Sequence, residues 1–322
     1  MREFIVGKND AGQRLDRFLA KAVPLLPASL AQKYVRIKRV KVNGARAARD
    51  LRLCEGDAVQ CYVSDEFFDA PDENNVYLTI AAPKLNIVYE DENILLLDKP
   101  AGLLCHAGDG AGGKTGGVTL LDHLLAYLYQ KREWRPRQEN AFTPALCNRI
   151  DRNTSGIVIA AKNAESRRIL NEKIRDREIA KRYLCVCLGR PEPPRGRLER
   201  FLRKDAKENR VRAYRHPVPD GRSAVTLYDT LLTRGALSLV EAELLTGRTH
   251  QIRVSFADMG HPLLGDGKYG NGAINRKYGE TAQLLCSYRL RFDFPTDAGS
   301  LAYLKGREFT VDTVPFQEKY FG

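Results

Sequence analysis

The sequence has no run of apolar residues long enough to cross a membrane, and its cysteines form no recognisable pattern. A membrane-spanning helix needs roughly 20 predominantly apolar residues, and the 322-residue chain contains no such stretch. Its first residues also lack the apolar segment of a secretory signal peptide. The seven cysteines are odd in number and dispersed, so they indicate neither a disulfide framework nor paired C-x-x-C motifs. We therefore expect a cytoplasmic protein, in a reducing compartment, with no membrane partner.

Patterns that hold a metal or mark a common catalytic site are missing as well. None of the five histidines stands in an H-E-x-x-H motif, and no Cys and His spacing fits a zinc site. The deaminase signature and the G-x-S-x-G elbow of hydrolases are absent. Cys185 and Cys187 alternate in an apolar segment, which is typical of small buried thiols on one face of a strand. We expect no metal and no cofactor.

One formal nucleotide-binding match occurs, at residues 108–115, which fit the P-loop pattern G-x-x-x-x-G-K-[ST]. That motif works where a strand leads into it and a helix begins at its Lys-Thr pair. Here the apolar segment 94–97 ends well before the match, and Gly116 and Gly117 would break the required helix. A nucleotide-driven ATPase is therefore a minor hypothesis, which a failure to bind ATP with Mg²⁺ would remove.

What the sequence does contain is an excess of positive charge. It holds 52 Lys and Arg against 40 Asp and Glu, a formal net charge of +12. Hydrophobic residues make up 43% of the chain, which is ordinary for globular proteins, and the length predicts two or three domains. The charge favours a polyanionic partner, and a nucleic acid before a membrane.

The charge is unevenly distributed and marks the expected domain boundaries. Residues 1–64 carry 13 bases and 6 acids, whereas residues 65–92 carry one base and 8 acids. The beginning of the acidic stretch combines Pro, Asn and acidic residues without helical or strand periodicity, as is typical of a linker. We predict a small domain at residues 1–64, a linker at 65–84 and a large domain at 85–322.

Two helices and a hairpin are predicted in the small domain. Apolar spacing indicates an amphipathic helix from residue 15 to 22. Ser29 is the expected cap of a second helix. The apolar face of that helix would consist of Leu30, Tyr34 and Ile37. The segment 40–44 ends in Asn-Gly, a strong hairpin signal.

Basic residues are concentrated on the second helix and the hairpin. The candidate phosphate contacts are Lys33, Arg36, Lys38, Arg39 and Lys41. A run of charge is usually a solvated surface, but this one accompanies a helix–helix–hairpin order, which favours RNA binding. The order, with residues 14–19, 41–44 and 56–57, resembles the alpha-L RNA-binding module of a ribosomal small-subunit protein and several RNA enzymes. The pair Lys38-Arg39 stands where that module often has glycine.

Two polar clusters in the large domain are candidates for chemistry. In the first, a loop at 147–155, Asp151 lies between two arginines and precedes the apolar segment 156–161 and a helix capped by Asn163. A positive neighbour favours the ionised carboxylate, which can act as a nucleophile. The second cluster, 245–254, contains two arginines and a histidine that would grip phosphates or reach the carboxylate. From the residues alone, an ion pair that pins a turn and a solvated helix start are the plainer interpretations.

These clusters, with three further motifs, resemble the RluA-type family of pseudouridine synthases over nearly the whole chain. The five motifs are Val88-Tyr89-Glu90-Asp91-Glu92-Asn93-Ile94 with Asp98-Lys99-Pro100-Ala101-Gly102, Asn148-Arg149-Ile150-Asp151-Arg152-Asn153-Thr154-Ser155-Gly156, Lys181-Arg182-Tyr183, Thr246-Gly247-Arg248-Thr249-His250-Gln251-Ile252-Arg253 and Gly260-His261-Pro262-Leu263-Leu264-Gly265-Asp266. Five motifs in one order are far more specific than any one of them. The resemblance implies an enzyme that isomerises uridine in RNA, without cofactor or metal, in a basic cleft across the sheet.

The resemblance also implies roles for individual residues. Asp151 matches the nucleophile, Tyr183 matches a tyrosine that packs on the target base, and Arg253 matches the arginine that pairs with the nucleophile. Arg149 matches an arginine that fills the RNA stack when the nucleotide flips out. Further candidate RNA contacts are Arg152, Arg248 and His250. The family's usual histidines are replaced by Asn148 and Cys286, which bears on the fit of the RNA more than on the reaction.

The predicted fold class is α+β, with a mixed, mainly antiparallel sheet and flanking helices in the large domain, plus the small α/β RNA-binding domain. Strand-like segments at 94–97, 156–161, 183–188 and 238–245 are separated by only a few helices, which disfavours a doubly wound sheet. The leading hypothesis is an RNA pseudouridine synthase that acts on large-subunit (23S) ribosomal RNA. Transfer RNA as substrate, and a non-catalytic RNA-binding or ribosome-assembly protein, are the alternatives. A monomer is expected.

Overall fold

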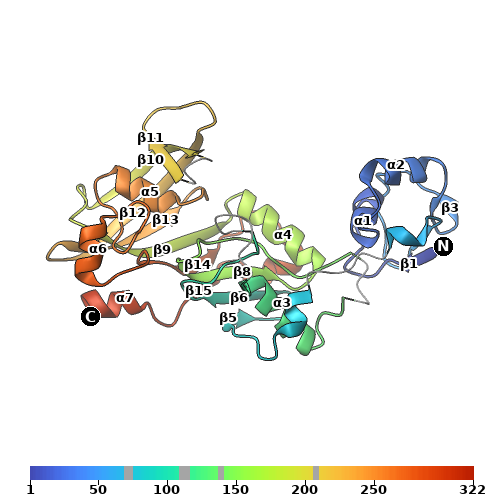
Figure 1. The fold of residues 1–322 in the computed structure, drawn as a ribbon, viewed down its shortest axis with the longest axis horizontal. Coiled ribbons are helices and arrows are strands. Elements are labelled where there is room, and N and C mark those ends of the chain that lie inside the picture. Colours follow the sequence, from blue (N-terminus) through green and yellow to red (C-terminus); the bar gives the residue numbers. More distant parts are fainter. Residues whose placement is uncertain (69–74, 109–116, 137–140, 206–209) are drawn as a thin grey trace. The chain divides into compact units, whose positions relative to one another are not determined.

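Two units of the chain carry the helices and strands in the computed structural model (Figure 1). The structure describes residues 1–68, 75–108, 117–136, 141–205 and 210–322. The first unit comprises residues 1–83, 122–145 and 161–167, and the second comprises residues 84–121, 146–160 and 168–322. Residues 1–64 lie wholly within the first unit. Of the expected linker, residues 69–74 lie outside the described residues, between the short helices η1 (Asp65–Phe67) and η2 (Asn75–Thr79).

Within the first unit, residues 1–64 form a small antiparallel sheet and two helices. Its strands are β1 (Arg2–Ile5), β2 (Val40–Val42), β3 (Ala45–Arg46) and β4 (Ala58–Cys61), in the order β1-β4-β2-β3. Helix α1 (Leu15–Ala22) buries Leu15, Phe18 and Leu19, the stripe that its spacing predicts. These side chains belong to one apolar core with the inward residues of β2 and β4.

The Asn43-Gly44 hairpin is confirmed between β2 and β3. Both turn residues have a positive φ, of 50° and 75°. Asparagine and glycine tolerate this left-handed geometry, which matches the twist of the two strands. The Asn43 side chain also accepts the N–H of Ala58 and donates to Asp57, each at 2.8 Å.

The second helix, α2 (Ala28–Arg36), differs from the prediction at both ends. Pro27 is its N-cap and no side chain caps it, so the expectation that Ser29 caps the helix is wrong. The fixed φ of proline suits a helix start, which places Ser29 inside the first turn. Because the helix ends at Arg36, Ile37 leaves the apolar face and is 46% exposed. Lys38 then adopts a φ of 64°, at the place where the alpha-L module often has glycine.

The second unit is built on a sheet of eleven strands. They are β5 (Asn86–Glu90), β6 (Ile94–Lys99), β7 (Ala145–Leu146), β8 (Ser155–Ala161), β9 (Ile179–Leu188), β10 (Arg195–Asp205), β11 (Arg210–Tyr214), β12 (Arg222–Arg234), β13 (Leu237–Leu244), β14 (Leu285–Phe292) and β15 (Glu308–Thr310). The order is β11-β10-β12-β13-β9-β14-β8-β6-β5, with β15 beside β14 and β7 beside β8. Neighbours from β11 to β14 are antiparallel, whereas β14 and β8 are parallel. The mixed, mainly antiparallel sheet confirms the predicted fold class.

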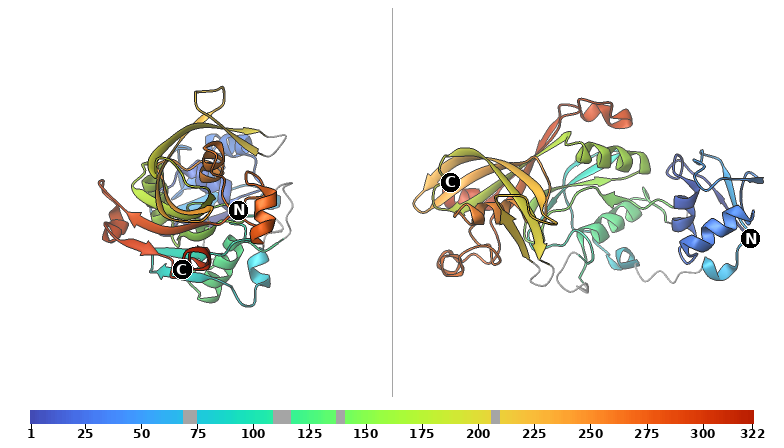
Figure 2. Two further views of the ribbon diagram at one scale, coloured as in Figure 1. Left: turned by 90° about the vertical axis from the view of Figure 1, so that its left-hand side faces the viewer. Right: turned by 90° about the horizontal axis from the view of Figure 1, so that it is seen from above.

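A helix fills the concave side of this sheet. The helices that follow η2 are α3 (Leu120–Gln130), α4 (Ala164–Arg175), α5 (Gln251–Asp258), α6 (Gly272–Tyr278), η3 (Gly299–Leu304) and α7 (Pro315–Phe321). The sheet curls around α5, which packs against β10, β11 and β12 (Figure 2). The cap predicted for α4 is present, because Asn163 accepts the N–H of Ser166 at 2.9 Å.

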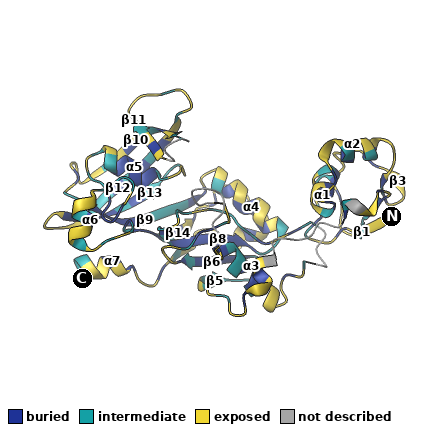
Figure 3. Ribbon diagram, in the orientation of Figure 1, coloured by how far each residue is buried: buried dark blue, intermediate teal, exposed yellow. Residues whose placement is uncertain are grey.

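Burial follows the apolar strands predicted from the sequence (Figure 3). Residues 94–97 of β6 and 157–161 of β8 are 0% exposed, as expected for strands covered on both faces. Cys185 and Cys187 of β9 are buried too, in line with their interpretation as packing thiols. Across the described ranges, no helix has the length and apolarity that a bilayer crossing requires.

Candidate active site

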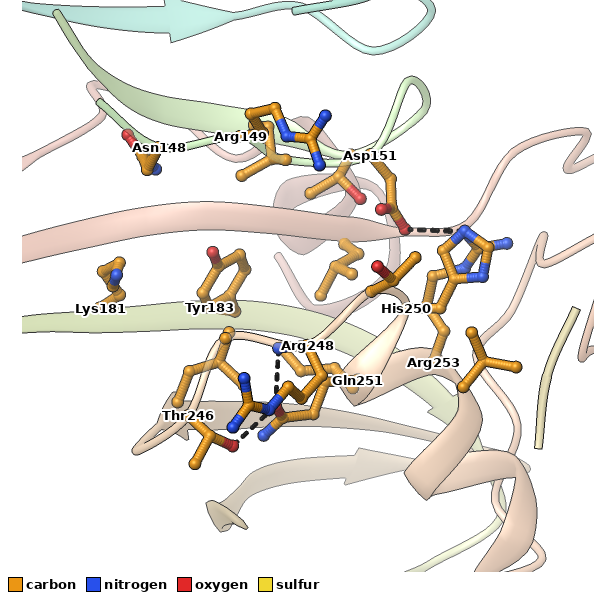
Figure 4. Close-up of a pocket in the computed structure, with 18 of the residues that line it drawn as sticks. Asn148, Arg149, Asp151, Lys181, Tyr183, Thr246, Arg248, His250, Gln251 and Arg253 are labelled. Carbon is orange, nitrogen blue, oxygen red and sulfur yellow. Dashed lines mark hydrogen bonds and ion pairs between the residues drawn. The ribbon is translucent and has the colours of Figure 1, made fainter. Parts of the chain in front are cut away.

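A cavity of about 1150 Å³ lies in the second unit, where three polar segments meet. One wall is the loop 147–154, which leads into β8, and another is β9 with Lys181 and Tyr183. The third is the segment 244–253, which follows β13 and begins α5 (Figure 4). The two polar clusters of the sequence therefore face one another across this cavity.

Asp151 is held by Arg253 at the start of α5. The guanidinium Nη1 of Arg253 donates to Oδ2 of Asp151 at 2.7 Å. Its other side forms a two-point contact with Asp266, from Nε at 2.7 Å and from Nη2 at 3.0 Å. A bidentate contact of this kind fixes the orientation of the guanidinium plane. Arg253 thus directs its remaining N–H group at Asp151, a residue 102 positions away in the sequence.

Asp266 is the fully buried member of this group, with 1% of its surface exposed. Burial alone would raise its pKa, but the hydrogen bond and charge of Arg253 and the backbone N–H groups of Tyr269 and Lys268 hold the pKa below its ordinary value. Burial likewise opposes the charge of Arg253, yet the two carboxylates together raise its pKa above its ordinary value. Arg253 and Asp266 therefore form a permanent ion pair that offers one hydrogen bond to Asp151.

His250 approaches Asp151 from the other side. Its Nε2 lies 3.9 Å from Oδ2 of Asp151, and its Nδ1 is 2.8 Å from the hydroxyl of Tyr269. That hydroxyl also accepts the backbone N–H of Val211 at 2.9 Å. The ring of Tyr269 lies against Arg253, whose Cζ is 5.3 Å from the ring centroid. Tyr269 therefore connects strand β11 with both groups that contact Asp151.

His250 is expected to remain neutral throughout the physiological pH range. Burial lowers its pKa to about 4, and the charge of Arg253 acts in the same direction, against that of Asp151. The unfolded chain then binds more protons between about pH 4 and pH 6.5, so the free energy of unfolding decreases as the pH falls through that window. The slope for one such group is at most about 1.4 kcal/mol per pH unit. Imidazole NMR signals of the folded protein test this, with His250→Gln as assignment control, and a midpoint near pH 6.5 would contradict it.

Tyr183 lies on β9 beneath the Asp151 loop. The residue is 6% exposed, and burial raises the pKa of its phenol to about 12. The charge of Asp151 acts in the same direction, whereas a hydrogen bond with Ser287 opposes it. A phenol that stays protonated can donate a hydrogen bond and present its apolar ring to a ligand. The structure thus brings Asp151, Tyr183 and Arg253 together, as the sequence resemblance implies.

The loop that carries Asp151 is held in place by Lys99, a residue that no local sequence pattern marks as functional. Lys99 is 0% exposed, and its ammonium donates to the carbonyl groups of Pro100, Leu103 and Arg152, each at 2.8 Å. Burial lowers its pKa to about 8, while Cys105 and Asp151 act in the opposite direction. The sequence did contain a sign of its importance, because Lys99 belongs to the first of the motifs that resemble the family.

The opposite end of the loop is fixed by a close backbone contact. Gly156, the second residue of β8, has a φ of 106°, and a Cβ at this position would lie 2.3 Å from the carbonyl oxygen of Ser287 in β14. Only glycine fits that approach. Asn148, at the start of the loop, accepts the N–H of Ile159 at 2.8 Å through its side chain. Asn148 therefore has a structural contact in place of the family's usual histidine.

Gln251 organises the segment from Thr246 to the start of α5. The side chain is 2% exposed and accepts from Thr246 at 2.8 Å and from the N–H of Arg248 at 3.0 Å. Its amide nitrogen donates to the Val225 carbonyl at 3.0 Å and to Thr226 at 2.9 Å. A fully satisfied buried amide holds this segment in one conformation.

Three of the arginines predicted to contact RNA lie at the cavity. Arg149, Arg152 and Arg248 are exposed and line it. Arg152 donates to the Gly102 carbonyl at 3.0 Å, and Arg248 donates to the Ser223 carbonyl at 3.1 Å. The candidate contacts Lys33, Arg36, Lys38, Arg39 and Lys41 are in the first unit and do not line this cavity.

The sequence predicted no metal site and contained one formal P-loop match. In the part of the chain that the structure describes, no group of three or more His, Cys, Asp or Glu side chains is placed to hold a metal. Residues 109–116, which make up most of the P-loop match, lie outside the described residues.

Comparison with protein families gives one match for the part of the chain that builds this site. The family model described as RNA pseudouridylate synthase matches residues 93–258. That range contains Asp151, Tyr183 and Arg253.

Whole-length relatives are found among curated bacterial proteins. Ribosomal large subunit pseudouridine synthase C of Vibrio vulnificus is 30% identical over 301 residues, covering 90% of this chain and 88% of its own. Ribosomal large subunit pseudouridine synthase D of Nitrosomonas europaea is 32% identical over 271 residues, covering 83% of this chain and 72% of its own. An uncharacterized RNA pseudouridine synthase of Aquifex aeolicus is 32% identical over 302 residues, covering 88% of this chain and 87% of its own.

A solved structure has a similar fold. Human RNA Pseudouridylate Synthase Domain Containing 4 superposes with a TM-score of 0.55 at 21% identity, covering 75% of this chain and 93% of that chain. At this identity the likeness concerns the fold, which agrees with the mixed sheet described above.

Proposed function

Because the chain belongs to the RNA pseudouridylate synthase family, we propose that Asp151 is the nucleophile with which it isomerises specific uridines in large-subunit ribosomal RNA. The activity itself, that of an RNA pseudouridine synthase, is the activity of the family. The single observation that supports the assignment of Asp151 is its hydrogen bond to Arg253, which Asp266 orients inside a cavity lined by basic residues.

The reaction exchanges one bond to the ribose for another. The bond between N1 of uracil and C1′ breaks, the ring turns, and C5 bonds to C1′. The proton on C5 is lost to solvent and N1 gains one, so atoms and charge balance. Asp151 supplies the electron pair that starts the exchange, by attack either on C6 of the ring or on C1′ of the ribose.

The neighbouring side chains have separate tasks in this proposal. Arg253 orients Asp151 through a charge-assisted hydrogen bond. Tyr183 packs its ring on the target base and serves as a proton donor or acceptor. Arg149, exposed on the loop, occupies the space that the flipped nucleotide leaves in the RNA, since a planar guanidinium stacks and stays charged.

Large-subunit ribosomal RNA is proposed as the target for two reasons. Several relatives with about 30% identity are large-subunit enzymes by name. The first unit also has exposed basic residues beside a small sheet, which suits the phosphates of a folded RNA. We propose that residues 1–64 are this RNA-binding domain, residues 65–84 its linker and residues 85–322 the catalytic domain, acting as a cytoplasmic monomer.

Removing charge from α2 is expected to weaken RNA binding more than the chemical step. Lys33 and Arg36 are exposed, so the double variant Lys33→Gln/Arg36→Gln should lower the slope of log affinity against log salt by roughly 1.4–1.8 if both contact phosphates. The single-turnover rate with saturating enzyme should stay close to that of the wild type. Lys277→Gln/Lys305→Gln removes two other exposed charges as a matched control. An unchanged slope in the α2 variant would contradict the RNA-binding role.

Mapping pseudouridines tests the proposed function. All ribosomal and transfer RNA from cells lacking the gene is compared with RNA from cells complemented by the wild type or by Asp151→Asn. Loss of specific sites in large-subunit RNA, restored only by the wild type, is the expected result. Loss of pseudouridines from transfer RNA would show that transfer RNA is the substrate in place of ribosomal RNA. Restoration of the lost pseudouridines by Asp151→Asn would refute the catalytic assignment and favour an RNA-binding role.

A further inference from the structure

Lys181 is a cation of the cavity that the roles above do not use. It lies on β9 two residues before Tyr183, so the two side chains share one face of the strand. Both line the cavity, and they follow one another along β9 in Figure 4 with Asp151 beyond Tyr183. Lys181 therefore lies beside the tyrosine at the end of the cavity away from the nucleophile.

Lys181 is half-buried, and its ammonium group has no counterion within the described part of the chain. No described side chain or carbonyl forms an ion pair or hydrogen bond with it, and burial alone lowers its pKa. Withdrawing a charge from water without a partner is unfavourable, and proteins rarely retain such a group without a use. A long apolar side chain would fill the same space without that cost.

Several other cations of the cavity are compensated in one of two ways. Arg253 is held by two carboxylates, and Arg152 and Arg248 donate to backbone carbonyl groups. Arg177 and Lys204 have exposed side chains, which water can solvate. Lys181 has neither form of compensation, and it is next to the tyrosine on which the base is proposed to pack. We therefore expect the acceptor for the ammonium group of Lys181 to be an atom of the target base.

The uracil ring acquires negative charge in either form of the reaction. Attack of a carboxylate on C6 pushes the electrons of the C5–C6 double bond onto O4, as in any addition to a conjugated carbonyl group. Attack on C1′ releases the ring as an anion whose charge is shared by N1, O2 and O4. The rotation of the ring that exchanges the positions of N1 and C5 also exchanges those of O2 and O4. One fixed cation therefore faces a charged carbonyl oxygen both before and after the rotation.

Resting on the proposed function, we propose that Lys181 is a catalytic residue whose ammonium group donates a hydrogen bond to a uracil carbonyl oxygen and stabilises the charge that develops there. Its partial desolvation strengthens that interaction, because a fixed donor in a water-poor site needs no reorganisation during the reaction. Phosphate binding is the competing use of the same charge, and kinetics separate the two.

The experiment uses the full-length protein and protein-free large-subunit ribosomal RNA, labelled with tritium on C5 of uridine, from cells lacking the gene. Tritium release under single-turnover conditions measures the reaction, and filter binding at several salt concentrations measures affinity. Lys181→Met removes the charge while keeping the length, and Lys181→Arg keeps a donor. Lys305→Met, an exposed lysine outside the cavity, is the matched control.

For Lys181→Met we expect a single-turnover rate lower by roughly 100-fold or more, the usual effect of removing one such donor. Affinity and its salt dependence should match the Lys305→Met control, and Lys181→Arg should recover part of the rate. The variant should also unfold at a higher temperature than the wild type, because an uncompensated charge has been replaced. That gain would show that the lost rate does not come from misfolding.

Two results would overturn the proposal. An unchanged rate with weaker binding, and a salt slope smaller by about 0.7–0.9, would make Lys181 a phosphate contact. An unchanged rate with unchanged binding would leave it a structural residue. Neither result affects the proposed function, which fails only if the wild type itself releases no tritium or if Asp151→Asn releases it at the wild-type rate.

Discussion

Asp151→Asn is expected to abolish pseudouridine formation while leaving the fold and RNA affinity intact. The amide keeps the shape of the side chain and an oxygen that can accept from Arg253, but it is a very poor nucleophile. A loss of roughly 1000-fold or more in the single-turnover rate is expected, as for other nucleophile replacements. Tritium release from C5 of uridine measures the rate, and filter binding measures the affinity.

Asp258→Asn provides the matched control for this change. Asp258 ends α5, pairs with Arg200 at 2.6 Å and does not line the cavity, so its replacement should leave the rate close to that of the wild type. Asp151→Asn with more than a tenth of the wild-type rate would remove Asp151 from the role of nucleophile. An equal loss of rate in both variants would indicate that the structure around α5 is disturbed, and not that a nucleophile has been removed.

Arg253→Met is expected to lower both stability and activity. It leaves Asp266 fully buried without its bidentate partner, and breaking a buried pair in this way costs about 3–5 kcal/mol. Because Arg253 lowers the pKa of Asp266, the pair stabilises the folded state above the unfolded pKa of about 3.9, and that contribution is lost as the pH falls through the folded value. Urea unfolding at pH 7 measures the cost.

The double variant Arg253→Met/Asp266→Asn separates the two effects. Removing the unpaired charge should restore part of the lost stability, since a neutral amide is less costly to bury and can still accept the N–H groups of Lys268 and Tyr269. Activity should remain low, because Asp151 still lacks the arginine that orients it. If Arg253→Met lowers the free energy of unfolding by less than about 1 kcal/mol at pH 7, the ion pair with Arg253 does not stabilise the buried Asp266.

Local patterns in the sequence were sufficient for much of the secondary structure. Helical spacing located α1, an Asn-Gly pair located the β2–β3 hairpin, and Asn163 marked the start of α4. Uninterrupted apolar runs located β6 and β8. These features depend on residues a few positions apart, so their physics is contained in short segments. The α2 start shows the limit, because Pro27 and Ser29 both suit a helix start and the sequence does not rank them.

The candidate site could be found in the sequence only through its ordered motifs. The residues around Asp151, taken alone, favoured an ion pair that pins a turn. Family resemblance selected Asp151, Tyr183 and Arg253, and their convergence in one cavity agrees with that selection. The pairing of Arg253 with Asp266 was not predicted, although both residues lie in motifs that resemble the family.

What the sequence by itself determined is therefore the fold class, the basic character and the candidate residues of the site. Only the tertiary structure decided which charges are paired. Lys99 meets Arg152 across 53 positions, Arg253 meets Asp151 across 102, and Lys181 meets no carboxylate among the described residues. Such contacts depend on how β9, β14 and the loops around them pack, and burial then sets the strength of each charge because water no longer screens it.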